Sequence, residues 1–200
     1  MKQNIKIILL TIMALLLIFW FQGFRFSEKS AITAFQSNKN IRIISSIPSY
    51  YGKIVAYESF DSNTIGIDCL KIYLGFIIKK DSSSGFDVSN DISEPFSEYW
   101  TFTNNKKNKH QYVSLIKVRD KNIKYVSIGQ NTSSKLPNLD NLSLKDIKKE
   151  PQIYSVGKVV NGYVIFIKDT DSTENHFIRT FDIKENLKYY KLPTTPIYYK

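Results

Sequence analysis

The sequence predicts an α+β fold in which one apolar N-terminal helix precedes a mainly antiparallel β body. Residues 7–21 carry no charge and only one polar side chain, as in a helix that crosses a membrane. Aromatic residues make up 14% of the chain and, with many Ile and Val, favour strands. Short apolar runs follow one another with brief polar turns between them. This spacing favours antiparallel hairpins over parallel crossovers.

The composition is that of a folded, basic protein. The chain has 200 residues, of which 42% are hydrophobic, enough for one domain or two small ones beside the N-terminal segment. The formal net charge is +10 at pH 7, which indicates either a soluble lysine-rich surface or an anionic partner. The lysines are dispersed and nowhere alternate with aromatic residues as in a nucleic-acid groove. No nucleic-acid partner is therefore expected.

Residues 1–26 are interpreted as a membrane anchor. The run Ile7–Phe21 carries no charge, and residues 5–24 give about 20 residues, enough at about 1.5 Å each to cross a membrane core of about 30 Å. A cleaved signal peptide would need small residues after the apolar run, whereas FWFQGFRF is bulky. We expect a single-pass, uncleaved helix with residues 27–200 outside the cytoplasm. A cleaved signal peptide and a buried soluble helix remain alternatives.

Residues 27–80 are expected to form a short helix followed by a β-meander. Ser27 is placed to cap a helix over Ser27–Asn38, in which Ala31, Ile32 and Phe35 share one face. Short apolar runs separated by turn residues then predict strands at Ile41–Ile47, Lys53–Phe60, Ile65–Tyr73 and Phe76–Lys80.

Residues 143–191 show the same order of elements. Ser143–Glu150 begins with a Ser-x-x-Asp capping box, and Asn161–Gly162 predicts a tight hairpin. The expected strands are Ile153–Val160, Tyr163–Lys168, Phe177–Ile183 and Leu187–Tyr190. The repeated order indicates an internal duplication. The alternative is that any β-meander in an aromatic, lysine-rich sequence looks this alike.

Between these segments the sequence predicts a loop or linker at residues 81–97 and a central region at residues 98–142. The linker is inferred from its Ser, Asp, Gly and Pro content. The central region contains three expected strands and a surface loop. These strands are Ser97–Thr103, Gln111–Val118 and Asn122–Gly129. Residues 192–200 are expected to form an extended tail.

One resemblance emerges from the order of these elements. The anchor, then SAITAF, KIVAYES, YLGFIIKK, IKVRDKNIKYVSI, GYVIFI and DIKENLKYY, resembles small single-span exported proteins of low-GC Gram-positive bacteria. The resemblance covers most of the chain and consists of structural patterns. It implies a membrane-anchored extracytoplasmic body and brings no activity or catalytic residue.

The sequence contains no catalytic, cofactor or metal motif. The lone cysteine, Cys69, alternates with Asp68 and is expected to face the core, where a thiol is inert. His110 and His176 lie at polar loops, without the spacing of a zinc site, and His176 is expected to be solvated. The carboxylates of residues 169–175 lack the frame of a calcium loop. We therefore expect no catalytic residue, metal or cofactor, although folding can pair distant carboxylates.

The expected function is that of a non-enzymatic module in the cell envelope. Its anchor and basic body favour binding of an anionic envelope polymer or a partner protein. The alternatives are an accessory or sensor domain that acts on a membrane partner, and an envelope hydrolase.

The candidate partner contact lies at the C-terminal end, where tyrosine rings stack on partners and lysines attract anions. Its residues are Lys188, Tyr189, Tyr190, Lys191, Tyr198 and Tyr199. The alternative is that Tyr189 and Tyr190 finish the last strand while the tail packs on the body.

Overall fold

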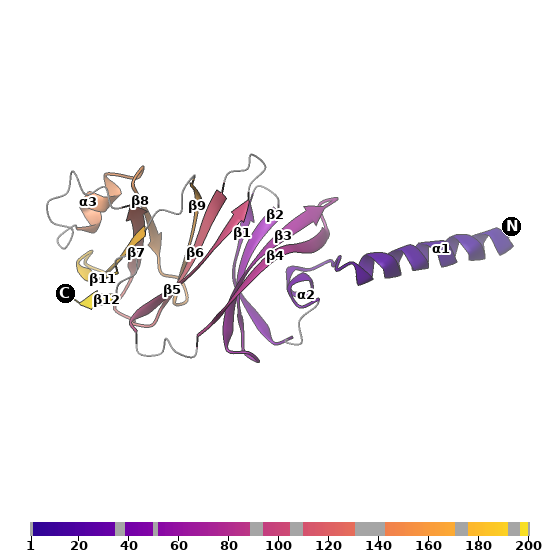
Figure 1. The fold of residues 1–200 in the computed structure, drawn as a ribbon, viewed down its shortest axis with the longest axis horizontal. Coiled ribbons are helices and arrows are strands. Elements are labelled where there is room, and N and C mark those ends of the chain that lie inside the picture. The colour runs from indigo at the N-terminus through magenta and orange to yellow at the C-terminus, as the bar shows by residue number, and fades with distance from the viewer. Residues whose placement is uncertain are drawn as a thin grey trace. The chain divides into compact units, whose positions relative to one another are not determined.

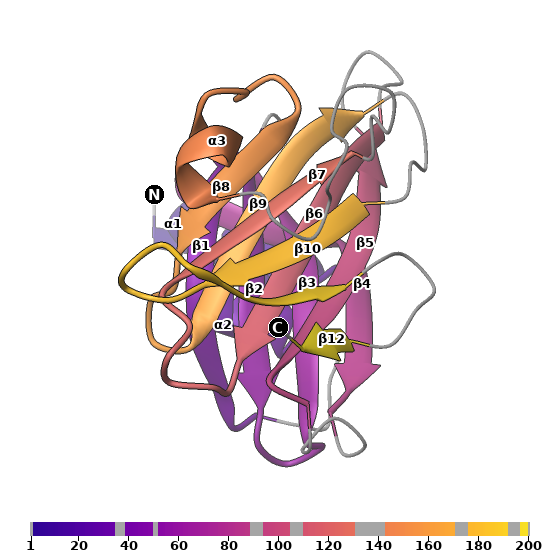
Figure 2. The ribbon, with the colours of Figure 1, turned by 90° about the vertical axis from the view of Figure 1, so that its left-hand side faces the viewer.

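The fold consists of two compact units that are rich in antiparallel strands (Figures 1 and 2). The computed structural model describes residues 2–34, 39–49, 52–88, 94–104, 110–130, 143–170, 176–191 and 197–199. The first unit spans residues 1–89 and the second unit residues 90–200. The predicted class, α+β with an apolar helix before an antiparallel β body, is confirmed.

The N-terminal helix α1 runs over Lys2–Phe21. Its part Asn4–Phe21 has a mean hydropathy of 2.3, so α1 is long and apolar enough to cross a membrane. The helix ends because Gly23 adopts a φ of 86°. The N–H of Gly23 then donates to the carbonyl of Trp20 (3.1 Å) and that of Phe24 to the carbonyl of Phe19 (3.2 Å), a Schellman stop. The prediction that the helix continues to residue 24 is therefore wrong.

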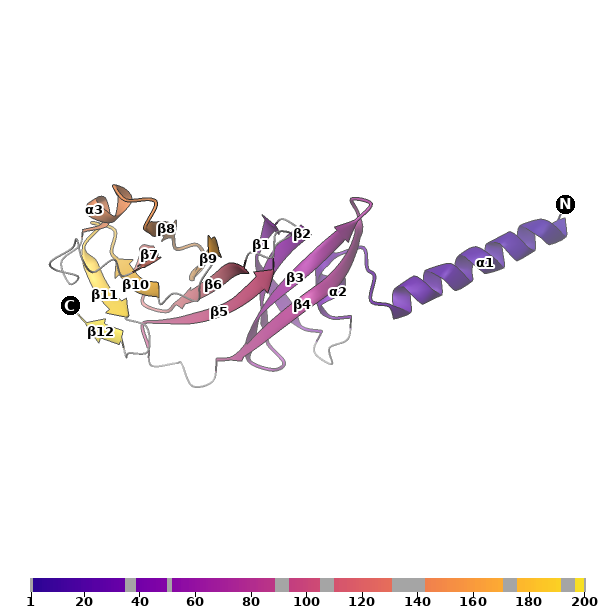
Figure 3. The same cartoon turned by 45° about the horizontal axis from the view of Figure 1, so that its top comes forward.

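The first unit contains a four-stranded antiparallel sheet with the order β1-β2-β3-β4 (Figure 3). Its strands are β1 (Ile41–Ser49), β2 (Gly52–Ser59), β3 (Thr64–Tyr73) and β4 (Ile77–Asp87). The short helix α2 (Glu28–Ile32) is capped by Ser27, which accepts from the N–H of Ser30, and buries Ala31 and Ile32 against one face of the sheet. The predicted order of one short helix and a four-stranded meander is confirmed here. The helix is shorter than the expected Ser27–Asn38, since it ends at Ile32, and residues 35–38 lie outside the described residues.

The prediction of a loop or linker over residues 81–97 is wrong at both of its ends. Strand β4 continues to Asp87, and strand β5 begins at Phe96. Residues 82–85 pair in register with residues 69–66 of β3. Backbone hydrogen bonds hold this ladder, so the Ser-rich composition that indicated a loop does not prevent a strand.

The second unit is a sandwich of two antiparallel sheets. The three-stranded sheet has the order β5-β6-β9, and the five-stranded sheet has the order β12-β11-β10-β7-β8. The first comprises β5 (Phe96–Asn104), β6 (His110–Val118) and β9 (Tyr163–Thr170). The second comprises β7 (Tyr125–Gln130), β8 (Tyr154–Lys158), β10 (His176–Phe181), β11 (Leu187–Lys191) and β12 (Ile197–Tyr199).

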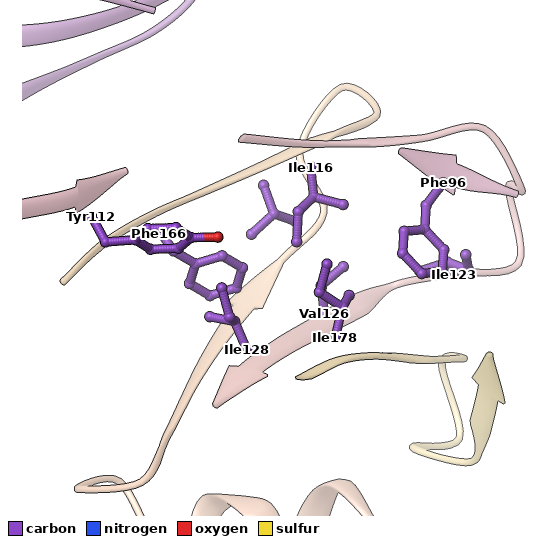
Figure 4. Close-up of a cluster of buried hydrophobic side chains, with 9 residues drawn as sticks. Phe96, Tyr112, Ile116, Ile123, Val126, Ile128, Phe166 and Ile178 are labelled. Atoms are coloured by element: carbon purple, nitrogen blue, oxygen red, sulfur yellow. The ribbon is translucent and has the colours of Figure 1, made fainter. Parts of the chain in front are cut away.

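The core of the second unit lies between these sheets. Figure 4 shows Tyr112 and Ile116 from β6 directed toward Val126 and Ile128 from β7 and Ile178 from β10. The helix α3 (Leu144–Lys148) covers the other face of the five-stranded sheet (Figure 2). Its Leu144 and Ile147 pack there on Tyr154 and Phe181. The expected cap is present, since Ser143 accepts from the N–H of Asp146.

The prediction of a second meander over residues 143–191 is wrong. Asn161 and Gly162 do form a turn, with φ of 51° and 83°, and Val160 pairs with Tyr163 across it. Beyond this bridge β8 pairs with β7 whereas β9 pairs with β6. The turn therefore joins the two sheets of the sandwich, and a pairing set by the core replaces the local hairpin. The topology gives no support to an internal duplication.

Candidate functional site

The second unit carries a group of aromatic side chains that reaches the surface at an edge strand. We call Trp100 and Phe102 of β5, Tyr112 of β6 and His176 of β10 the Trp100 cluster. The ring centroids of Trp100 lie 5.4 Å from Phe102 and 6.1 Å from Tyr112, and those of Tyr112 and His176 are 4.5 Å apart. Trp100 is 49% exposed, so one large ring is both held by its neighbours and open to solvent.

The strand period and the sheet register place this cluster. Residues 98, 100 and 102 of β5 share one face because side chains alternate along a strand. Trp100 pairs with Ser114 and Phe102 pairs with Tyr112 on β6. The residue opposite the indole, Ser114, is small, and among the described residues β5 is an edge strand of its sheet.

A partly buried hydrogen-bond network adjoins the cluster. Oε1 of Glu98 accepts from the Tyr112 hydroxyl (2.6 Å) and from the Ser114 hydroxyl (2.8 Å). Burial raises the pKa of Glu98 and outweighs these two hydrogen bonds and the positive charge of Lys191, which lower it. Burial and the Glu98 charge also raise the pKa of Tyr112. The network orients the Tyr112 ring on which Trp100 rests.

Among the described residues, the site is an open surface beside a shallow depression. A depression beside the cluster has no room for a water-sized molecule. Its lining residues are Tyr112, Ile128, Gly129, Phe166, Lys168 and His176. In the part of the chain that the structure describes, no three His, Cys, Asp or Glu side chains gather as metal ligands. Such a surface suits stacking of a flat ring on Trp100.

The six residues predicted as a partner contact do not form one face. The Tyr189 ring packs against the sandwich core, and its hydroxyl donates to Oδ2 of Asp120 (2.8 Å). Tyr190 follows Tyr189 on β11 and therefore points to the opposite face. Tyr198 and Tyr199 lie on β12, whose backbone pairs with β11. Contact with a partner stays a prediction for all six.

The two histidines and the cysteine lie on three different strands. His176 is nearly buried against Tyr112, so the expectation of a solvated loop residue is wrong: pairing of β10 with β7 draws it into the sandwich. His110 starts β6, where its backbone pairs with Asn104 and Thr170. Cys69 belongs to the first unit, is partly buried, and has a thiol pKa raised by burial. Of the predicted carboxylate-rich loop, residues 171–175 lie outside the described residues.

Sequence reasoning missed the Trp100 cluster, although one signal was present. The stretch SEYWTFT holds the one tryptophan outside residues 1–26. The period of a strand places this tryptophan on the same face as Glu98 and Phe102. No protein-family model matches the chain, and no curated protein and no solved structure is significantly similar to it. The function is therefore inferred from the geometry alone.

Proposed function

We propose that the protein is a membrane-anchored, non-enzymatic module of the cell envelope that binds an anionic, sugar-containing polymer through the Trp100 cluster. The observation that carries this proposal is Trp100, exposed on an edge strand and held by Phe102 and Tyr112. A ring held by its neighbours stacks on a sugar with little loss of side-chain entropy. Tryptophan is also common among the residues that dominate binding energy at interfaces.

Charge supports an anionic ligand. The net charge is +10, and two lysines lie near the cluster: Lys191 close to Glu98, and Lys168 beside His176. Positive charge spread over a surface attracts an anionic polymer and speeds its association. The helix α1 supports the anchored location, since it has the length and hydropathy of a span. Placement of the body outside the cytoplasm rests on the resemblance to exported Gram-positive proteins.

Tryptophan fluorescence tests the proposal in the full chain held in lipid nanodiscs. Trp20→Phe leaves Trp100 as the one tryptophan, since the chain has two. Titration with soluble peptidoglycan strands is expected to shift or quench its emission. Poly-glutamate, which has charge but no sugar rings, is expected to change it much less.

Two variants separate stacking from general attraction. In a pull-down with the same strands, Trp100→Ala is expected to weaken binding at least tenfold, which corresponds to about 1.4 kcal/mol. Phe60→Ala, which removes an exposed ring from the first unit, is the matched control and is expected to bind as the parent does. Equal binding by the parent and Trp100→Ala would contradict the proposal. Release of shortened strands during incubation would also contradict it and would identify the protein as a hydrolase.

A further inference from the structure

We propose that the first unit also rests on the membrane surface, through the turn between β3 and β4. The proposed occupant of this surface is the headgroup region of a bilayer that contains anionic lipids. The inference rests on the proposed membrane location of α1 and is independent of the ligand at Trp100. We call Phe26, Tyr73, Leu74 and Phe76 the juxtamembrane patch.

The patch is apolar and open. Leu74 is 82% exposed, Phe26 66%, Phe76 57% and Tyr73 41%. The rings of Phe26 and Phe76 stack with centroids 6.4 Å apart, so a segment near α1 and the β3–β4 turn form one surface. Contiguous exposed apolar side chains of this kind mark interaction sites.

Turn chemistry does not account for Leu74. Its φ is 52°, in the left-handed region that favours Gly, Asn and Asp and disfavours a bulky side chain. The following residue, Gly75, has a φ of 79° and is the residue expected there. The backbone at Leu74 is therefore strained, and the strain places an exposed leucine at the tip of the turn. An apolar contact made by the Leu74 side chain explains why a leucine occupies this position.

Backbone contacts hold the turn at the end of α1. The N–H of Arg25 donates to the carbonyl of Ile78 (2.8 Å), and the N–H of Ile78 donates to the carbonyl of Arg25 (2.7 Å). The Phe24 ring lies 5.4 Å from that of Tyr73. Because the Schellman stop at Gly23 ends the apolar helix just before these contacts, the turn and the C-terminal end of α1 lie close together. A membrane that contains α1 therefore has its interface near the patch.

The side chains around the patch match that interface. Nζ of Lys79 lies 4.9 Å from the Phe24 ring centroid, and the Arg25 guanidinium lies 3.9 Å from that of Trp20. Arg25 also donates to the carbonyls of Trp20 (2.7 Å) and Phe24 (2.8 Å). Aromatic rings with nearby cations are typical of the headgroup region. Arg25 is buried, so the partly exposed Lys79 is the cation of this pair that attracts anionic lipids. This chemistry favours a lipid surface over an apolar protein groove.

Depth-dependent quenching tests the inference in nanodiscs that hold one full chain each. In a Cys69→Ser background, Leu74→Cys carries an environment-sensitive label, and lipids with nitroxides at shallow or deep positions are the quenchers. The label is expected to emit at short wavelength and to be quenched by shallow nitroxides, more strongly with phosphatidylglycerol than with phosphatidylcholine alone. Phe60→Cys is the matched control. It lies in the β2–β3 turn, at the opposite end of β3, and is expected to emit as in water.

A third label separates failure of this inference from failure of the anchor. Ala14→Cys lies in the middle of α1 and is expected to be quenched by deep nitroxides. Quenching at position 14 without quenching at position 74 would overturn the membrane contact and leave the anchor intact. No quenching at position 14 would overturn both. Protection of position 74 only in discs with two chains would assign the patch to a second copy and contradict the lipid contact.

Discussion

Oδ2 of Asp68 on β3 lies 3.6 Å from Nζ of Lys80 on β4, with the carboxylate fully buried. The pair stands on the face of the sheet that α2 covers, since Asp68 is in register with Val55 of that core and Lys80 also donates to the carbonyl of Ile32 (3.4 Å). Tyr57 donates to Oδ1 of Asp68 (3.4 Å). These contacts place Asp68 and Lys80 between α2 and the strands β3 and β4.

The first prediction concerns this carboxylate and pH. Burial raises the pKa of Asp68 above its ordinary value of 3.8, against lowering by the Ser83 hydrogen bond and the Lys80 charge. The folded state therefore keeps the proton to higher pH than the unfolded chain. The associated stability is fully present below pH 3.8 and is lost as pH rises through the folded pKa.

Asp68→Asn mimics the neutral form, so it is expected to raise the unfolding temperature at pH 7 and to have little effect below pH 3.8. Thermal unfolding of the full chain in mild detergent at both pH values measures this. A variant less stable than the parent at pH 7 would show that the ion pair with Lys80 outweighs the burial of the charge.

The second prediction concerns the hydrogen-bond network beside Trp100. Tyr112→Phe removes the hydroxyl that donates to Glu98 at 2.6 Å and is expected to cost about 2 kcal/mol of unfolding free energy. It is also expected to shift the emission of Trp100, which rests on the ring. Ser114→Ala removes the other donor to the same oxygen and is expected to leave the ring in place. Unchanged stability and emission in Tyr112→Phe would show that the network does not orient the cluster.

The third prediction compares two glycines in the first unit. An added Cβ meets nothing within 4 Å at Gly75 or at Gly85, but only Gly75 has a positive φ, 79°. Gly75→Ala is therefore expected to cost about 1 kcal/mol through backbone strain alone. Gly85→Ala is expected to leave the stability unchanged or to raise it. Equal stabilities of the two variants by thermal unfolding would contradict the left-handed turn.

The fourth prediction concerns the C-terminal residues. Deletion of residues 193–200 removes β12, which pairs with Tyr189, Tyr190 and Lys191 of β11. The loss of one edge strand is expected to lower the unfolding temperature, by roughly 2–4 °C for each kcal/mol of unfolding free energy that is lost. Polymer binding is expected to remain. Lost binding with unchanged stability would instead assign the contact to the tyrosine-rich tail, as the sequence predicts.

The fifth prediction concerns the N-terminal helix. If α1 remains as an anchor, the intact mass of protein extracted from the membranes of its cells includes residues 2–26. N-terminal sequencing provides an independent check. A mature chain that begins near Ser27 would contradict both the anchor and the lipid contact of the β3–β4 turn.

The features that could be predicted are those that depend on residues close together in the sequence. The apolar run of α1, the serine caps of α2 and α3 and the meander of β1 to β4 follow from periodicity, capping and short turns, all of which act over a few residues. The Asn161–Gly162 turn was predictable for the same reason. The position of Trp100 on a strand followed from alternation, but its exposure depends on which strand lies at the sheet edge.

The apolar helix, the strand-rich antiparallel class and most of the strands follow from the amino-acid sequence alone, because they depend on local residue patterns. Packing in three dimensions places β8 and β9 in different sheets and lets the Ser-rich residues after Lys80 continue β4. It also determines that His176 and Tyr189 lie against the sandwich core while Trp100 stays open. Long-range core packing and backbone hydrogen bonds determine which strands pair. Neither produces a short-range pattern in the sequence, so the pairing cannot be predicted from local residue patterns.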